Sequence, residues 1–216
     1  MMDSEKFNFG EVVDFEKHIE LSIPNFQTLD SIFVSVCREY AQPESIVLDL
    51  GCSTGRFLST VPKTEGVRYI GVDTVNFKDK RDGFEFVSGD IEEVLQEYVG
   101  ANVSVVVCMF MLQFLGKAKR KRIAELLQQL VRNGAILLIS EKIFLEDSKL
   151  QTLIHRIHIQ EKRKGFTDKE ILDKDNQLSV SMFCKTEHEI DRELREIGTP
   201  SKVWQSYNFM GYVITG

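Results

Sequence analysis

The sequence predicts an α/β fold with a Rossmann-like, doubly wound and mostly parallel sheet, and three observations support that prediction. Several short runs are apolar and rich in β-branched residues, which is typical of strands buried on both faces of a parallel sheet. A one-sided apolar stripe separates the last two runs, as in a helix that covers one face of a sheet. The alternation of strands and helices implies right-handed crossovers between parallel strands.

The strands are predicted from five runs, most of which end in turn residues. The third run is short and alternates between apolar and polar residues, whereas the other four are mostly apolar. In chain order the runs cover residues 45–50, 67–72, 84–87, 103–109 and 135–139.

The best-defined helix is predicted over residues 119–131, between the last two strands. Its apolar face consists of residues at helical spacing: Ile123, Leu126, Leu127 and Leu130. Asn133 and Gly134 predict where this helix ends, because glycine readily adopts the left-handed conformation of a C-terminal cap.

Two regions fall outside this alternation. Residues 11–40 are predicted to be helical, and the region after the last parallel strand is predicted to form two or three helices before a hairpin over 202–207 and 210–215. We therefore expect a single domain of three parts. They are a core over about 45–140 plus 198–216, an N-terminal helical cap over 1–44 and a helical insertion over 146–197.

Composition excludes several classes of protein. With 43% hydrophobic residues the chain can build a core, so we do not expect it to be disordered. Its 27 basic and 33 acidic residues give a net charge of −6, which excludes non-specific coating of nucleic acid or of an anionic membrane.

Cysteine spacing and hydropathy predict where the protein works. The four cysteines form no CxxC pair, so neither a zinc ribbon nor a redox pair is expected. The first residues are polar and acidic, and the longest apolar run, 105–112, is too short to span a bilayer. We expect a cytoplasmic protein without a membrane partner.

The most informative stretch for function is DLGCSTG, residues 49–55, where the first strand meets the next helix. In an open parallel sheet, ligands bind beyond the carboxyl ends of the strands, and glycine there lets the backbone approach them. We expect Asp49 to receive an ammonium group. The turn residues expected to bind the ligand are Gly51, Cys52, Ser53 and Gly55. The alternative is an ordinary strand–turn–helix joint with incidental glycines.

Acidic residues also follow the next two strands. Asp73 lies 22 residues after Gly51, where a carboxylate can accept both hydroxyls of a ribose, and Thr74 stands beside it. Asp90 and Ile91 follow the third strand, where a carboxylate and a backbone N–H can bind the edge of an adenine. Together these positions predict an adenosine ligand. The glycine spacing disfavours NAD, and no G-x-x-x-x-G-K-[ST] motif supports ATP.

With these residues the chain resembles class I S-adenosylmethionine-dependent methyltransferases. It resembles more specifically the carboxy-S-adenosylmethionine synthases, from about residue 7 to residue 215. The segments that carry the resemblance are 22–26 (SIPNF), 49–53 (DLGCS), 112–115 (LQFL), 138–142 (LISEK), 146–149 (EDSK) and 207–209 (YNF). The resemblance implies the class I methyltransferase fold and S-adenosyl-L-methionine, or its derivative carboxy-S-adenosyl-L-methionine, as the cofactor.

The resembling family transfers a carboxyl group from prephenate onto S-adenosylmethionine, and its product serves modification of the tRNA wobble uridine. Its members dimerise, which implies a homodimer here. Phe26 and Met109 stand where the family has Tyr and Asn, and we expect both to contact the ligand. Asp175 stands where the family has the arginine that holds the ligand carboxylate, and it would repel that group. Lys162 and Arg163 lie nearby in the sequence.

These departures favour ordinary S-adenosylmethionine as the ligand. The first hypothesis is methyl transfer to an unidentified small-molecule or nucleic-acid acceptor. The second is a carboxy-S-adenosylmethionine synthase that uses prephenate through a rearranged carboxylate site. The third is a non-catalytic adenosyl-binding partner subunit.

The sequence assigns no general base, but three residues are candidates for catalysis. Glu141, expected after the fifth strand, either faces the mouth of the pocket or forms a salt bridge with Lys142 or a helix cap. His158 aligns with a histidine of the family, which indicates a role in the acceptor pocket. Tyr207 lies in the pocket or the core, with the core favoured. His155, His158 and Glu161 share one helical face, but interleaved apolar residues argue against a metal site there.

A block of basic residues begins the helix after the fourth strand: Lys117, Lys119, Arg120, Lys121 and Arg122. The simplest interpretation is a solvated helix start. Cations at a helix N-terminus oppose the helix dipole, however, and a block of like charge often marks an anionic partner. A tRNA or DNA acceptor therefore stays open as a second hypothesis for this surface.

Overall fold

Eight strands build the sheet of the computed structural model, which describes residues 15–216. They are β1 (Ile46–Leu50), β2 (Arg68–Asp73), β3 (Glu85–Ser88), β4 (Val103–Met109), β5 (Ile136–Phe144), β6 (Lys185–Thr186), β7 (Thr199–Ser206) and β8 (Phe209–Thr215). Their order is β3-β2-β1-β4-β5-β8-β7, and β6 pairs with β5 beside that path. β1 to β5 are parallel, whereas β8 runs antiparallel to β5 and to β7, so the predicted α/β sheet with a final hairpin is confirmed.

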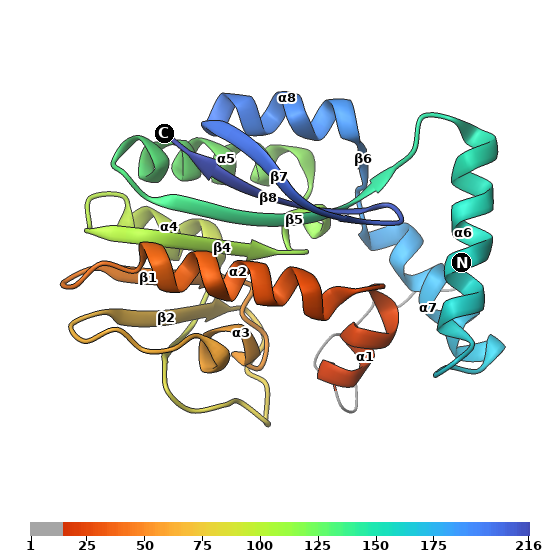
Figure 1. Cartoon of the computed structure of the whole chain (residues 1–216), viewed down its shortest axis with the longest axis horizontal. Helices are drawn as coiled ribbons and strands as arrows, with labels where there is room; N and C mark the ends of the chain where they lie inside the picture. Colours follow the sequence, from red (N-terminus) through yellow and green to blue (C-terminus); the bar gives the residue numbers. More distant parts are fainter. Residues whose placement is uncertain (1–14) are drawn as a thin grey trace.

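The helices of the described chain cover both faces of the sheet. They are α1 (Phe15–Ser22), α2 (Phe26–Tyr40), α3 (Arg56–Thr60), α4 (Ile91–Tyr98), α5 (Lys117–Arg132), α6 (Ser148–Lys162), α7 (Asp168–Ser181) and α8 (Glu187–Ile197), with a 3-10 turn at Leu112–Phe114. Apolar residues of α2 and α3 pack on one face, and those of α4, α5 and α8 pack on the other (Figure 1). α6 and α7 stand beside the carboxyl end of β5 (Figure 1).

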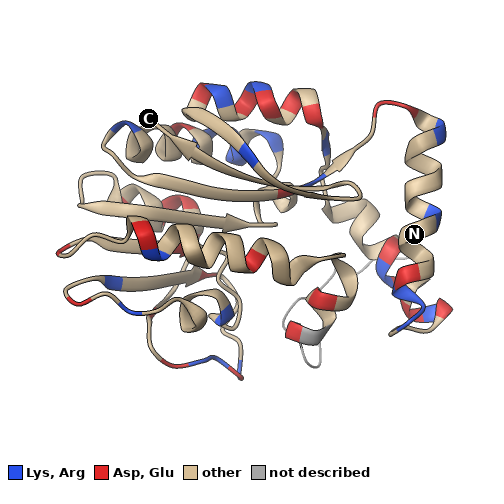
Figure 2. Cartoon of the chain, in the orientation of Figure 1, with Lys and Arg blue, Asp and Glu red and all other residues tan. Residues whose placement is uncertain are grey.

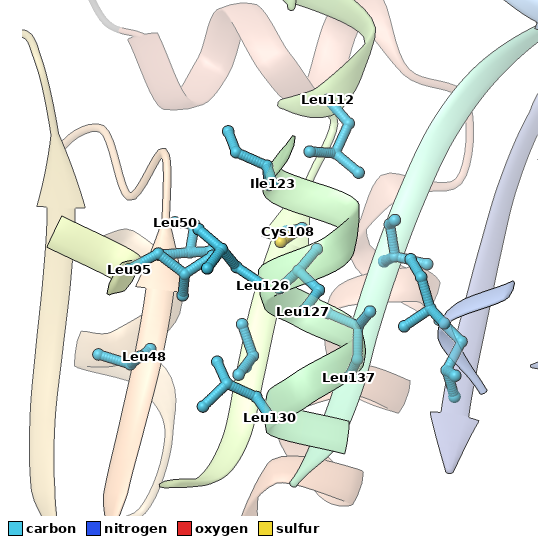
Figure 3. Close-up of a cluster of buried hydrophobic side chains, with 14 of the residues drawn as sticks. Leu48, Leu50, Leu95, Cys108, Leu112, Ile123, Leu126, Leu127, Leu130 and Leu137 are labelled. Carbon is cyan, nitrogen blue, oxygen red and sulfur yellow. The ribbon is translucent and has the colours of Figure 1, made fainter. Parts of the chain in front are cut away.

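The apolar patterns that predicted these elements form the core. Figure 3 shows Leu126, Leu127 and Leu130 of α5 packed beside strand residues such as Leu48 and Leu137, and all of these are buried. Charged residues lie mainly on helices and loops, and the strands carry few of them (Figure 2). α5 ends as predicted, with Asn133 as its C-cap and the next residue, a glycine, at φ 101°.

The position of β1 creates the ligand-binding crevice of the sheet. β1 pairs with β2 on one side and with β4 on the other. The chain adds β2 and β3 on the first side of β1 and then crosses to add β4 and β5 on the second side. This is the topological switch point at which α/β sheets bind ligands. The carboxyl ends of β1 and β4 and the loops after them therefore border one crevice, and the end of β2 lies next to it.

The fifth strand is longer than predicted, and one predicted segment is not described. β5 runs to Phe144, five residues beyond the predicted end, because its last two residues pair with β6 and the backbone N–H of Lys142 donates to Oε1 of Gln113 at 2.7 Å. Residues 1–14 of the predicted N-terminal cap lie outside the described residues. None of the helices in residues 15–216 is long and apolar enough to cross a membrane.

Candidate functional site

A pocket of about 460 Å³ opens at the carboxyl ends of β1, β2, β4 and β5. Its volume is ordinary for a small-molecule site. α1, the start of α2, α6 and α7 contribute its other walls. Among the residues predicted to bind the ligand or to act in catalysis, those that line it are Phe26, Asp49, Gly51, Cys52, Ser53, Asp73, Thr74, Ile91, Met109 and His158.

The glycine turn after β1 has the backbone that the sequence predicted. Gly51 has φ 77° and its N–H donates to the carbonyl of Val72 at 2.8 Å. A Cβ at Gly51 would lie 2.8 Å from Cγ of Met111, so the turn has no room for a side chain. Gly55 has φ 78° but does not line the pocket, which corrects its predicted ligand contact. A Cβ there would lie 2.1 Å from the ring of Phe84, so this glycine serves packing.

Asp73 is held rigidly at the end of β2. Its Oδ2 accepts the N–H of Ser53 and its Oδ1 accepts the N–H of Val75, both at 2.9 Å. Each carboxylate oxygen keeps a further lone pair, so two adjacent hydroxyls of a ribose can still be bound. Ser53 lines the same pocket, and its buried hydroxyl has no hydrogen-bond partner in the described chain. S-adenosylmethionine fits this end of the pocket because its ribose hydroxyls can donate to the free lone pairs of Asp73.

Asp49 gives the pocket a buried carboxyl group beside the glycine turn. Only 3% of the residue is exposed, and burial, reinforced by Asp73, raises its pKa to about 7. Arg56 opposes that shift, but its guanidinium is bound by both carboxylate oxygens of Asp30, at 2.6 and 2.9 Å. A cationic group of a ligand would therefore find Asp49 with little competition from the protein's own cations.

Asp90 does not have the role that was predicted for it. Its Oδ1 accepts the N–H of Glu92 at 2.9 Å as the N-cap of α4, and its Oδ2 pairs with Lys119. Asp90 does not line the pocket, whereas Ile91 and Lys119 do. Unlike Asp73, Asp90 lies outside the pocket lining, so the structure does not bring its carboxylate to the ligand as predicted.

Glu141 is also not a pocket residue, contrary to the first of its predicted roles. It lies within β5 rather than after it, it is fully buried, and it does not line the pocket. Nη1 of Arg120 donates to its Oε2 at 3.2 Å, so its partner is Arg120 rather than Lys142. Nε of Arg120 also donates to Glu193 at 2.8 Å, and this buried network joins α5, β5 and α8. Burial raises the pKa of Glu141 to about 7 although Arg120 opposes the shift.

His158 and Tyr207 lie against each other, but only His158 lines the pocket. Nε2 of His158 donates to the carbonyl of Ser22 at 2.7 Å, which ties α6 to α1. Burial and then Lys162 lower the pKa of His158 to about 3, so the imidazole is neutral at physiological pH. The half-buried ring of Tyr207 stacks on His158 at 6.3 Å, so its position agrees with packing rather than with a ligand contact.

The two histidines predicted on one face of α6 lie in different environments. His155 is 42% exposed in its side chain and lies 3.8 Å from Asp175. His158 is buried and bound to a carbonyl oxygen. Within residues 15–216 no group of three or more His, Cys, Asp or Glu side chains is arranged to hold a metal ion.

Three lysines line the pocket on the side of α6 and α7, and sequence reasoning missed two of them. They are Lys142 of β5, Lys162 of α6 and Lys174 of α7. Asp175, expected to face the ligand, does not line the pocket, and neither does Arg163, which pairs with Asp168 at 2.7 Å. Neighbouring residues of a helix point about 100° apart, so Lys174 faces inward where Asp175 does not. The only available signal was the SEK motif that contains Lys142.

The basic block of α5 is largely matched with acidic residues. Arg120 is 3% exposed and bound to Glu141 and Glu193, so its predicted contact with an anionic partner is wrong. Lys119 pairs with Asp90, and Arg122 binds Glu92 through Nε at 2.5 Å and Nη2 at 2.9 Å. Lys117 and Lys121 are exposed, and Lys121 lies 3.8 Å from the carboxylate of Glu125 one turn further along α5.

Comparison with known proteins agrees with this geometry. A family model described as a methyltransferase domain matches residues 48–139. An O-methyltransferase family protein from Burkholderia thailandensis has a TM-score of 0.56 at 16% identity, covering 87% of this chain and 56% of that chain. The plantazolicin methyltransferase BamL, solved with a triazolic desmethylPZN analog and SAH, has a TM-score of 0.59 at 11% identity, covering 93% of this chain and 86% of that one. At such identities the likeness shows the fold, and fold and pocket define a class I S-adenosylmethionine-dependent methyltransferase.

Two bacterial relatives define the family. A carboxy-S-adenosyl-L-methionine synthase of Hydrogenovibrio crunogenus is 30% identical over 224 residues, which cover 96% of this chain and 88% of that protein. The synthase of Aliivibrio fischeri is 32% identical over 223 residues, with 94% and 90% covered. The chain belongs to the carboxy-S-adenosyl-L-methionine synthase family, and its cofactor is S-adenosyl-L-methionine or a derivative of it.

Proposed function

We propose that this protein transfers the methyl group of S-adenosylmethionine to a second ligand that binds between the glycine turn and the α6–α7 side of the pocket. The observation that carries the proposal is the fixed carboxylate of Asp73 beside the buried Asp49 and the glycine turn. Asp73 would accept the ribose hydroxyls, and Asp49 would attract the ammonium group. Phe26 and Met109, which both line the pocket, would contact the bound cofactor.

Positioning is the main task of the residues in this site. The sulfonium of bound S-adenosylmethionine supplies a methyl group that is already activated, so the protein needs mainly to orient the acceptor in line and to exclude water. Neither Glu141 nor Tyr207 lines the pocket, and the Nε2 of His158 is bound to a carbonyl oxygen. We therefore assign no general base to this chain.

Carboxyl transfer from prephenate onto S-adenosylmethionine is the second candidate function. The names of the relatives support it, and the three pocket lysines offer positive charge for a carboxylate although the family arginine is absent. The substitutions at Phe26 and Met109 count against it. The third candidate, a non-catalytic partner subunit, is disfavoured because Asp49, Gly51 and Asp73 line one pocket.

Mass spectrometry separates these candidates. The purified protein is denatured and the released ligand is identified, and fresh protein is then incubated with S-adenosylmethionine, with and without prephenate. Ordinary S-adenosylmethionine or S-adenosylhomocysteine as the bound species, and no prephenate-dependent gain of a carboxyl group, supports methyl transfer. Detection of carboxylated S-adenosylmethionine would instead support carboxyl transfer, the second candidate. A protein that binds no S-adenosylmethionine would favour the third candidate, a non-catalytic partner subunit.

A homodimer and a cytoplasmic location are proposed with this function. Exposed apolar residues at helical spacing on α6 support the dimer: the exposed fractions of Leu150, Leu153 and Ile157 are 46%, 53% and 36%. Sedimentation of the purified chain at micromolar concentration tests it, and a single monomeric species would remove the dimer. A role in tRNA modification, as the resemblance implies, would suit a nucleic-acid acceptor that meets Lys117 and Lys121.

A further inference from the structure

An arginine lies at the acidic end of the pocket, the end that holds Asp49 and Asp73. Arg56 is the first residue of α3, directly after the glycine turn, and it lines the pocket with only 17% of its side chain exposed. Within the described chain it is the one cation among the charges that shift the pKa of Asp49. A guanidinium that paired with Asp49 would compete with the ammonium group of a ligand for the same carboxylate. The contacts that hold Arg56 in place therefore bear on ligand binding.

Asp30 of α2 holds the guanidinium from outside the pocket. Nη1 of Arg56 donates to Oδ2 of Asp30 at 2.9 Å, and Nη2 donates to Oδ1 at 2.6 Å. The side chain of Asp30 is 14% exposed, and Asp30 does not line the pocket. Two parallel hydrogen bonds between a guanidinium and a carboxylate fix the direction of the guanidinium as well as compensating its charge.

The ring of Phe26 provides a second restraint on the arginine. Phe26 lies one helical turn before Asp30 on α2, so the two side chains are neighbours on the surface of that helix. Cζ of Arg56 lies over this ring, 4.7 Å from its centre, which is a favourable distance for a cation–π contact. The guanidinium is therefore held by its edge on the carboxylate and by its face on the ring.

Three other carboxylates interact with the charge of this arginine: Glu16, Glu20 and Asp49. The carboxylate of Glu16 is already bound by Arg81, through Nε at 2.8 Å and through Nη2. Glu20 is exposed, so water screens its attraction. Asp49 is 3% exposed, and it takes part in no ion pair of the described chain. Asp49 is therefore the carboxylate to which Arg56 would turn if its pair with α2 were broken.

We propose that Asp30 is a positioning residue of the donor site, because it keeps Arg56 from pairing with Asp49. Asp49 then stays available for the ammonium group of S-adenosylmethionine. This inference rests on the proposed function, since it assigns the ammonium group to Asp49. It predicts that loss of Asp30 weakens only ligands that carry the ammonium group, whereas loss of a purely structural ion pair would weaken all adenosine ligands alike.

Calorimetry with two ligands tests this role. S-adenosylhomocysteine carries the ammonium group, whereas 5′-methylthioadenosine has the same adenosine and thioether but lacks the amino-acid moiety. Both ligands are titrated at pH 8 into the parent protein, Asp30→Asn, Arg56→Met and the variant that combines these two changes. Glu39→Gln, which removes an exposed carboxylate further along α2, is the matched control.

We expect Asp30→Asn to lose about tenfold in affinity for S-adenosylhomocysteine and to bind 5′-methylthioadenosine within about twofold of the parent. The combined variant should regain affinity for S-adenosylhomocysteine to within about threefold of the parent, because it has no guanidinium that can pair with Asp49. Arg56→Met should bind S-adenosylhomocysteine at least as tightly as the parent. Glu39→Gln should match the parent with both ligands.

Several results would overturn the inference. They are an equal loss for both ligands in Asp30→Asn, no loss for either ligand, and a combined variant that stays as weak as Asp30→Asn. A further one is an Arg56→Met protein that binds S-adenosylhomocysteine more weakly but 5′-methylthioadenosine normally, since Arg56 would then hold the carboxylate of the ligand. Failure of the parent to bind S-adenosylhomocysteine would instead refute the proposed function.

Arg56→Lys keeps the test usable if Asp30→Asn does not fold. An ammonium cannot form the two parallel hydrogen bonds of a guanidinium, so Asp30 holds the lysine less firmly and its charge can shift towards Asp49. We expect Arg56→Lys to bind S-adenosylhomocysteine about threefold or more weakly than Arg56→Met does. Equal affinity of these two variants for S-adenosylhomocysteine would contradict the role of Asp30.

Discussion

Behind β5, the guanidinium of Arg120 is buried against the carboxylates of Glu141 and Glu193, whereas in the α6 wall the ammonium of Lys162 is buried with no such partner in the described chain. In the first region, carboxylates of β5 and α8 compensate the buried charge of the arginine, which lies on α5. In the second region, a bound ligand would have to compensate the charge of the lysine. The comparison teaches that burial alone does not tell a structural cation from a ligand-binding one, and that the partners decide.

The largest expected effect is on stability, and it has opposite sign in the two regions. Arg120→Met leaves Glu141 buried without its partner and should lower the free energy of unfolding by about 3–5 kcal/mol. Lys162→Met removes a desolvated charge, so the free energy of unfolding should not fall and should rise by up to about 3 kcal/mol. Urea denaturation of both variants and the parent measures the difference.

A drop in stability for Lys162→Met as large as that for Arg120→Met would break the comparison. It would mean that the lysine serves the fold rather than a ligand. Lys169→Met, an exposed change on α7, shows what loss of a lysine costs when burial is not involved.

The next effect concerns the acidic end of the pocket. Asp73→Asn should weaken binding of S-adenosylhomocysteine by about a hundredfold, because charge-assisted hydrogen bonds to two ribose hydroxyls are lost or weakened. Asp79→Asn, in the exposed loop that follows, is the control and should leave affinity unchanged. Calorimetry gives both values, and a loss of less than about threefold at Asp73 would place the ribose elsewhere.

Binding of a cationic ligand at the acidic end should depend on pH. Asp49 has a pKa of about 7, and a cationic ligand binds its ionised form. Affinity for S-adenosylmethionine should therefore fall by up to about tenfold per pH unit below pH 7 and level off above it.

A control variant tests whether Asp49 causes the fall in S-adenosylmethionine affinity below pH 7. Asp49→Asn should abolish the change in S-adenosylmethionine affinity between pH 6 and 8, since an amide does not titrate. Glu141 also has a pKa near 7 but lies outside the pocket lining, so its titration should leave the profile of the parent unaffected. A fall of the same size in Asp49→Asn would contradict the assignment of the ammonium group to Asp49.

The smallest effect is expected at the basic block. Charge reversal at Lys117 and Lys121, two exposed members of the block, should weaken retention of nucleic acid about two- to tenfold at low salt, with the difference vanishing at high salt. Retention on a tRNA column across a salt gradient measures this. Unchanged retention would remove the anionic partner at this surface.

The parallel sheet was predictable because its strands are short and β-branched and because helices follow β1, β3 and β4, so local pattern and tertiary structure agree. The donor end was predictable for a related reason. Asp49, Gly51 and Asp73 directly follow or end predicted strands, and the carboxyl ends of parallel strands share one edge of the sheet. Residues that end successive predicted strands are therefore expected to lie close together at this edge of the sheet.

The three pocket lysines were not predictable in the same way. Lys142 and Lys174 are 32 residues apart in the sequence, and only the packing of α6 and α7 beside β5 brings them to one pocket. The position of Glu141 was predicted wrongly for a related reason. The apolar run that predicted β5 stops before Glu141, whereas the strand continues through it because Arg120 pairs with its buried carboxylate. Side-chain direction and partners, rather than spacing, decide both cases.

The most direct test of the account is calorimetric titration of the purified protein with S-adenosylhomocysteine at pH 8, where Asp49 is ionised. We expect one binding site per chain with a dissociation constant of about 1–100 μM, in the range usual for enzyme substrates, and loss of that heat in Asp73→Asn. No measurable binding by the parent protein, or equal binding by the Asp73→Asn variant, would contradict the claim that this pocket is a donor site.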